Sequence, residues 1–139
     1  MALHQWQRLR FLSAEPEEIS PGSVRTTVKL RGRDAQTLVG VAESASKGSG
    51  ELRSAALATV DAVCKATGTP GSEMDLLGVR LVKAFEATVV IVALAVPQRD
   101  GGKRRLVGAY LADDDVVRGA AIAVLNATNR YLGSVAFSD

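Results

Sequence analysis

The residue types that most often do covalent chemistry are scarce in this chain, which holds one histidine, His4, and one cysteine, Cys64. A Ser-His-Asp or Cys-His arrangement would have to use His4, and a metal site needs three or four His, Cys, Asp or Glu ligands. Cys64 follows Ala62 and Val63 in an apolar run, so we expect it in the core rather than as an exposed reactive thiol. The sequence therefore predicts a protein that is not an enzyme and holds no metal or cofactor.

Acidic residues cluster at two places. Asp113, Asp114 and Asp115 precede a predicted helix, where they can cap free N–H groups and oppose the positive end of the helix dipole. The alternative is weak binding of a hard cation, although the central glycine and distal glutamate of a calcium loop are missing. The second cluster, EPEE at residues 15–18, is interpreted as a solvated loop.

Two further groups of residues could bind an anion. The run Lys47, Gly48, Ser49 and Gly50 precedes a predicted helix, and free N–H groups at a helix start attract carboxylate or phosphate. The other group lies on a predicted hairpin and consists of Arg99, Lys103, Arg104 and Arg105. Guanidinium forks suit phosphate, so these side chains could contact a nucleotide or an RNA backbone. The alternative is an ordinary solvated hairpin, and no stacking aromatic stands among them to favour single-stranded nucleic acid.

Composition narrows the class of protein. The 139 residues carry a net charge of +2 and are 47% apolar, values typical of a globular domain and too weakly basic to require a nucleic-acid partner. The longest apolar run, Val89 to Val96, is much shorter than a membrane helix, and the first residues lack the apolar stretch of a signal peptide. We expect a cytoplasmic protein that does not bind a membrane.

An internal repeat sets the expected architecture. Leu38 to Ala42 (LVGVA) corresponds to Leu106 to Tyr110 (LVGAY), 68 positions further along. Arg53 to Ala62 (RSAALATVDA) corresponds to Arg118 to Ala127 (RGAAIAVLNA), 65 positions further along. Two matches in the same order indicate a duplication.

Each copy is predicted to contain three strands and a helix. Strict alternation from Val24 to Arg31 is typical of a half-buried strand, and Gly68 and Gly133 are expected to end the two helices. The expected strands cover residues 6–12, 24–31, 36–43, 77–85, 88–96 and 105–112, and the expected helices 51–67 and 115–132. The fold class is α+β: a duplicated βββα unit, mainly antiparallel sheet with two helices packed on one face. We expect a single domain with repeats at about 5–68 and 75–133.

Two apolar features leave alternatives open. Val89 to Val96 is apolar at every position, so both faces of its sheet should be covered, either by a second subunit or by loops of the same chain. Leu57 and Ile122 occupy matching places beside the buried stripes of the two helices. They could contact each other, a partner or water.

The strand–loop–helix segments resemble the C-terminal regulatory domain of the 2-isopropylmalate synthase family. The residues that carry the resemblance are Gly48 to Glu51 and Arg118 to Leu132 (RGAAIAVLNATNRYL). The resemblance implies a pair of βββα units that dimerise and bind an amino-acid effector near the loops before the helices, here Gly48 to Gly50 and Asp113 to Asp115. The second loop is acidic where the family has a glycine-containing turn, so leucine is not assigned as the ligand.

These observations predict a stand-alone, non-catalytic regulatory module that binds a small metabolite, an amino acid or a nucleotide, at or near a homodimer interface. The first alternative is a structural or adaptor protein that docks a partner protein through its sheet face without a small ligand. The second is an RNA-binding α+β domain.

Overall fold

The structure is a computed structural model that describes residues 9–32, 35–46, 50–68, 73–98, 100–113 and 115–138, with side chains up to residue 130. The elements are β1 (Arg10–Ser20), β2 (Ser23–Arg31), β3 (Thr37–Ala45), α1 (Gly50–Thr67), β4 (Asp75–Ala84), β5 (Ala87–Pro97), β6 (Lys103–Leu111) and α2 (Val116–Ser138). The predicted α+β class and the duplicated βββα order are confirmed.

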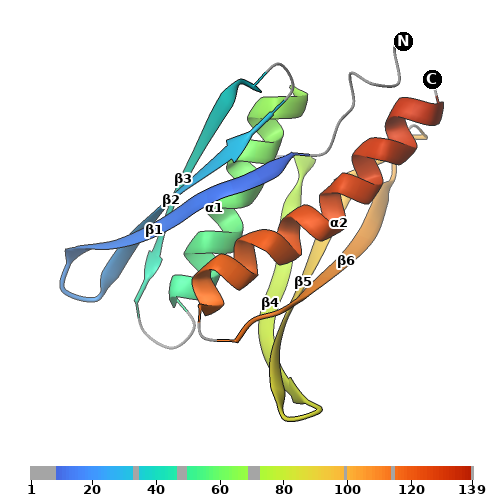
Figure 1. The fold of residues 1–139 in the computed structure, drawn as a ribbon. Coiled ribbons are helices and arrows are strands. Elements are labelled where there is room, and N and C mark those ends of the chain that lie inside the picture. The colour runs from blue at the N-terminus through green and yellow to red at the C-terminus, as the bar shows by residue number, and fades with distance from the viewer. Residues whose placement is uncertain are drawn as a thin grey trace.

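The strands form two separate antiparallel sheets, β1-β2-β3 and β4-β5-β6, rather than one (Figure 1). The predicted alternation of β2 is confirmed, since Val24, Thr26, Val28 and Leu30 are buried. On β5 the inward residues Val90, Val92, Leu94 and Val96 are buried, while the residues between them are only half-buried. Each sheet therefore has one face in the core.

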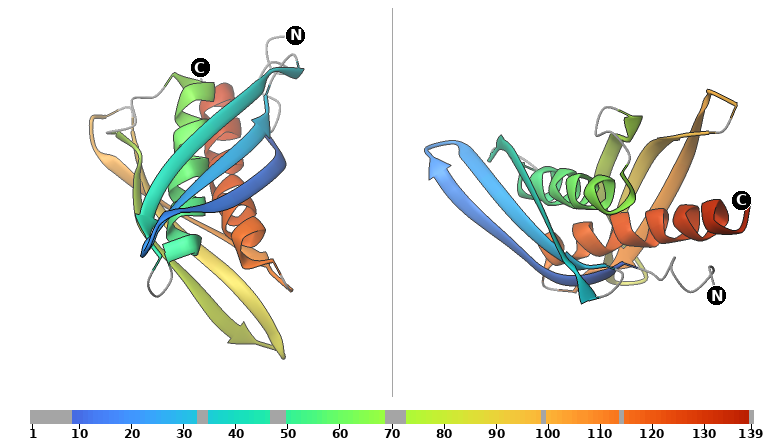
Figure 2. Two further views of the ribbon diagram at one scale, coloured as in Figure 1. Left: turned by 90° about the vertical axis from the view of Figure 1, so that its left-hand side faces the viewer. Right: turned by 90° about the horizontal axis from the view of Figure 1, so that it is seen from above.

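Each helix packs on the sheet of its own unit and also contacts the first strand of the other unit. Thus α1 lies on β2 and β3 and reaches β4, whereas α2 lies on β5 and β6 and reaches β1. The helices lie side by side and begin at the same end of the molecule (Figures 1 and 2). Because each helix contacts the first strand of the other unit, the boundary between the units runs along α1 and α2.

The contacts repeat as the sequence does. The Lys65 amine donates to the carbonyl of Val39, and the Arg130 guanidinium donates to the equivalent carbonyl of Val107. The Val41 amide donates to the Asp61 carboxylate, and at the matching place the Asn126 amide donates to the Ala109 carbonyl. These side chains satisfy the open edges of β3 and β6, which would otherwise be free to pair with another strand.

Two predicted boundaries are wrong. The strand expected at 6–12 is instead β1 at 10–20, and it includes the EPEE segment that was interpreted as a loop; residues 6–8 lie outside the described residues. Pro16 is compatible with a strand here because β1 is an edge strand, where a missing N–H breaks no ladder. Gly68 ends α1 in a left-handed conformation (φ 72°), but α2 continues through Gly133 to Ser138, because a helical glycine does not stop a helix.

Candidate functional site

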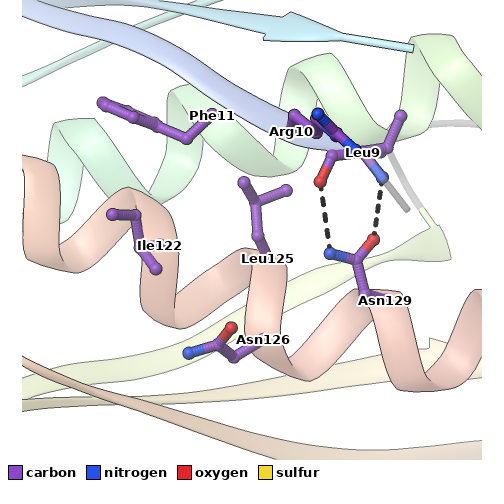
Figure 3. A pocket seen from close by; sticks show the side chains of 7 residues that line it. All are labelled: Leu9, Arg10, Phe11, Ile122, Leu125, Asn126 and Asn129. Carbon is purple, nitrogen blue, oxygen red and sulfur yellow. Dashed lines mark hydrogen bonds between the residues drawn. The ribbon is translucent and has the colours of Figure 1, made fainter.

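A solvent-open hollow lies where β1 of the first unit meets α2 of the second. It has a volume of about 610 Å³. Its lining residues are Leu9, Arg10 and Phe11 from the first unit and Ile122, Leu125, Asn126 and Asn129 from α2 (Figure 3). We call it the β1–α2 hollow.

Asn129 fixes the two walls of this hollow relative to each other. The Leu9 amide donates to Asn129 Oδ1 at 3.1 Å, and Asn129 Nδ2 donates to the Leu9 carbonyl at 3.3 Å (Figure 3). The side-chain amide therefore binds the backbone of Leu9 as a neighbouring strand would. This pair of bonds joins residues 120 positions apart and holds the start of β1 against α2.

The wall of the hollow is apolar and its rim is cationic. Leu125 is buried, while Phe11 and Ile122 are half-buried and face each other across the hollow (Figure 3). The Arg118 guanidinium lies over the Phe11 ring at 5.5 Å from its centroid, a cation–π contact that fixes the ring. With the exposed Arg10 at the mouth, the surroundings suit a small molecule with an apolar body and an anionic group.

None of the residues lining this hollow was predicted as a site from the sequence. For Ile122 the sequence left three alternatives open, namely contact with Leu57, with a partner or with water. The structure places it in the wall of the hollow. The available signal was the pair Asn126 and Asn129 at a spacing of three on the predicted helix. Their partners lie on β6 and before β1, so no local pattern reveals what they bind.

The predicted loop sites are described only in part. Lys47, Gly48, Ser49 and Asp114 lie outside the described residues. Gly50 begins α1 so close to Ala45 that a side chain would overlap the Ala45 carbonyl, which gives this glycine a packing role. Asp115 accepts the Arg118 amide at 3.0 Å and so caps α2, as predicted, and Asp113 is exposed. Ligand binding at these loops stays a prediction.

The predicted basic hairpin divides into residues with different surroundings. Arg99 lies outside the described residues. Lys103 forms an ion pair with Asp75, whose carboxylate lies 3.1 Å from the Lys103 amine, and this amine also donates to the Glu73 carbonyl. Arg104 and Arg105 line the second, smaller hollow.

Within the described ranges, no three His, Cys, Asp or Glu residues come together in a group that could hold a metal ion. No helix in the same part of the chain is long and apolar enough to span a membrane.

Cys64 is buried on α1, as predicted. Burial raises the pKa of its thiol above the ordinary value, and the nearby Asp61 carboxylate raises it further. We expect a disulfide reagent to modify native Cys64 far more slowly than the urea-unfolded chain, because the thiol is both hidden and protonated. Equal rates in the two states would contradict this.

The same shift predicts alkaline destabilisation. The pKa of the Cys64 thiol is higher in the folded chain than in the unfolded chain, so deprotonation favours the unfolded chain. The free energy of unfolding therefore keeps its full value below the unfolded pKa of about 8.5 and falls as the pH rises through the folded pKa. Urea unfolding across this range should show the loss in the wild type, and the loss should be smaller in Cys64→Ala.

No protein-family model matches the chain, and the curated proteins include no significant sequence match to it.

Proposed function

We propose that this chain is a non-catalytic regulatory module that senses a small metabolite in the β1–α2 hollow. The observation that carries the proposal is that both units build this hollow, so a ligand bound there contacts the first strand of one unit and the helix of the other. Such a ligand would bias the position of the units relative to each other, which is what a sensor requires. The resemblance to the regulatory domain of 2-isopropylmalate synthases supports the regulatory role, although it implies a ligand at the loops before the helices rather than in this hollow.

The lining of the hollow favours one ligand class. An apolar side chain would pack on Phe11, Ile122 and Leu125, and a carboxylate would lie near the Arg10 guanidinium. Amino acids with apolar side chains have both parts. A nucleotide would need to place its base on the same apolar wall and its phosphate at the rim.

A thermal-shift panel of amino acids and nucleotides tests the proposal. A true ligand at 100 times its Kd adds about 2.7 kcal/mol to the free energy of unfolding and raises Tm by several degrees. Ile122→Ala should abolish most of this shift. The matched control is Leu57→Ala, the equivalent position of the other helix, which does not line the hollow and should keep the shift. A flat panel, or equal losses in the two variants, would count against the proposal.

The outer face of the second sheet supports self-association, which belongs to the same proposal. This outer apolar face consists of Val82, Val89, Ile91, Ala93, Val107, Ala109 and Leu111, which lie in neighbouring rows of the sheet around one charged residue, Arg80. The corresponding rows of the first sheet carry Glu15, Glu17, Arg25, Lys29 and Glu43. The pattern of charge therefore differs between two units that otherwise share their fold.

The β4–β5 hairpin extends this apolar surface beyond the helices (Figure 1). At its tip Phe85 is 101% exposed, and both Phe85 and Glu86 have left-handed backbones (φ 54° and 60°). Left-handed backbone costs roughly 1 kcal/mol for each such residue, yet here it presents an aromatic ring to solvent. Val82, Val107 and Leu111 of the outer apolar face are 38%, 54% and 53% exposed, so this face is open to a partner.

The exposed face also favours a second candidate function, a structural or adaptor protein that docks a different protein on the outer apolar face. The two functions differ in the state of the purified chain. A homodimer covers the face with a second copy, whereas an adaptor remains monomeric until its partner is present.

A further inference from the structure

The second hollow lies on the other side of α2, against the beginning of β6. It has a volume of about 320 Å³ and is lined by Arg104, Arg105, Leu106, Val107, Ala127 and Arg130. Three guanidinium-bearing residues from two elements therefore surround one small depression. Arg130 was not among the basic residues predicted from the sequence.

These arginines form no ion pair with any of the residues that the structure describes. Arg130 donates one hydrogen bond, to the neutral carbonyl of Val107 at 3.3 Å. The register pairs Arg104 with the buried Val96, which puts Arg104 on the face of the sheet that α2 covers. Arg105 pairs with Ala95 instead, so its side chain starts on the opposite face of the sheet, and Arg104 and Arg130 are the two arginines on the face that α2 covers.

The first unit provides an internal comparison. At the places of Arg104 and Arg105 it has Gln36 and Thr37, and at the place of Arg130 it has Lys65. Lys65 makes the same bond to a strand carbonyl, but its charge is balanced by Asp61 at 3.3 Å.

In the second unit the position of Asp61 is taken by Asn126, which removes the only balancing carboxylate. At these four places the side chains of the first unit sum to no net charge, whereas those of the second unit sum to three positive charges. Packing alone does not require the arginines.

We propose that Arg104 and Arg130, with Arg105 at the edge of the hollow, form a binding site for the phosphate group of a small molecule. Guanidinium groups bind phosphate oxygens through paired, charge-assisted hydrogen bonds, and the hollow is large enough for one or two phosphates. The site goes beyond the sensing function proposed for the β1–α2 hollow and takes a different ligand.

Isothermal titration of the full chain with inorganic phosphate, pyrophosphate and ADP tests the site and distinguishes a free phosphate from one carried by a nucleotide. Exchanging the arginines for their first-unit counterparts, Arg104→Gln with Arg105→Thr, should weaken pyrophosphate binding by tenfold or more, since each lost charge-assisted bond corresponds to about tenfold in Kd. Asn126→Asp keeps every arginine but restores the carboxylate beside Arg130, and it should weaken binding about threefold to tenfold.

Two controls separate this site from other effects. Lys65→Ala removes one cation from the equivalent place in the first unit and should leave binding unchanged. Ile122→Ala should also bind pyrophosphate normally even if it abolishes sensing in the β1–α2 hollow. Absence of binding at millimolar concentrations, equal weakening by Lys65→Ala, or salt-sensitive retention of RNA without binding of the small anions would each overturn the proposal.

Discussion

Replacing either Gly40 or Gly108 with alanine is expected to destabilise the fold by about 3 kcal/mol or more, a large part of the 5–15 kcal/mol that typically holds a domain together. A Cβ on Gly40 would overlap the Ala58 carbonyl oxygen and lie 2.6 Å from the Ala62 nitrogen. A Cβ on Gly108 would overlap the carbonyl oxygen of Ala123 in the same way. The obstacles are backbone atoms of α1 and α2, which cannot rotate away as a side chain would. Each helix would have to move off its sheet.

Urea unfolding measures this loss directly, and Gly78→Ala is the matched control. Gly78 also lies in a strand, but a Cβ there would meet nothing within 4 Å and its φ is not left-handed. Gly78→Ala should therefore leave the midpoint nearly unchanged or raise it slightly. If Gly40→Ala and Gly78→Ala shifted the midpoint equally, the close approach of helix and strand would be disproved.

The same two glycines explain why the duplication could be recognised from the sequence. They stand at matching positions of the repeated segments LVGVA and LVGAY, and each meets a matching alanine of the repeated helix segment, Ala62 or Ala127. A close contact between a helix and a strand constrains the sequence of both elements, so both repeat when the unit is duplicated. The strands with regular alternation were predictable for a similar reason, because the side-chain period is local.

The hollows could not be predicted in this way. Leu9 and Asn129 meet across 120 positions, and Arg130 reaches the arginines of β6 only because α2 lies on that strand. Local patterns gave each residue a plausible place in its own element and no information about its distant neighbours. The comparison between units supplies the missing signal. Asp61 and Asn126 stand at equivalent places, but Asp61 accepts from the Val41 amide, Asn126 donates to the Ala109 carbonyl, and only Asp61 carries a charge.

The uninterrupted apolar run from Val89 to Val96 predicted that both faces of its sheet are covered. The inner face is covered by α2, but no helix or strand described in the structure covers the outer one, where Val107 and Leu111 are 54% and 53% exposed (Figure 2). Coverage by elements of the same chain is therefore not found in the part of the chain that the structure describes. Coverage by a second copy or by another protein stays a prediction.

The largest effect on assembly is expected from charges placed on the outer apolar face. If a second copy covers it, light scattering at micromolar concentration should give about twice the chain mass of 14.6 kDa for the wild type. Val107→Glu combined with Leu111→Glu should give a monomer. The reason is that a two-fold interface would bury four unpaired carboxylates, and even one costs several kcal/mol.

The control for this experiment is Val39→Glu, because Val39 occupies the place of Val107 in the first unit and is 38% exposed on a face that already carries Lys29 beside it. This variant adds one carboxylate to the same kind of strand, where Glu43 already stands at the place of Leu111, and it should remain a dimer. A wild-type chain that is monomeric from the outset would exclude self-association. The outer apolar face would then be left to a different protein, and the adaptor function would become the better explanation of why this chain keeps Phe85 fully exposed at the tip of a hairpin.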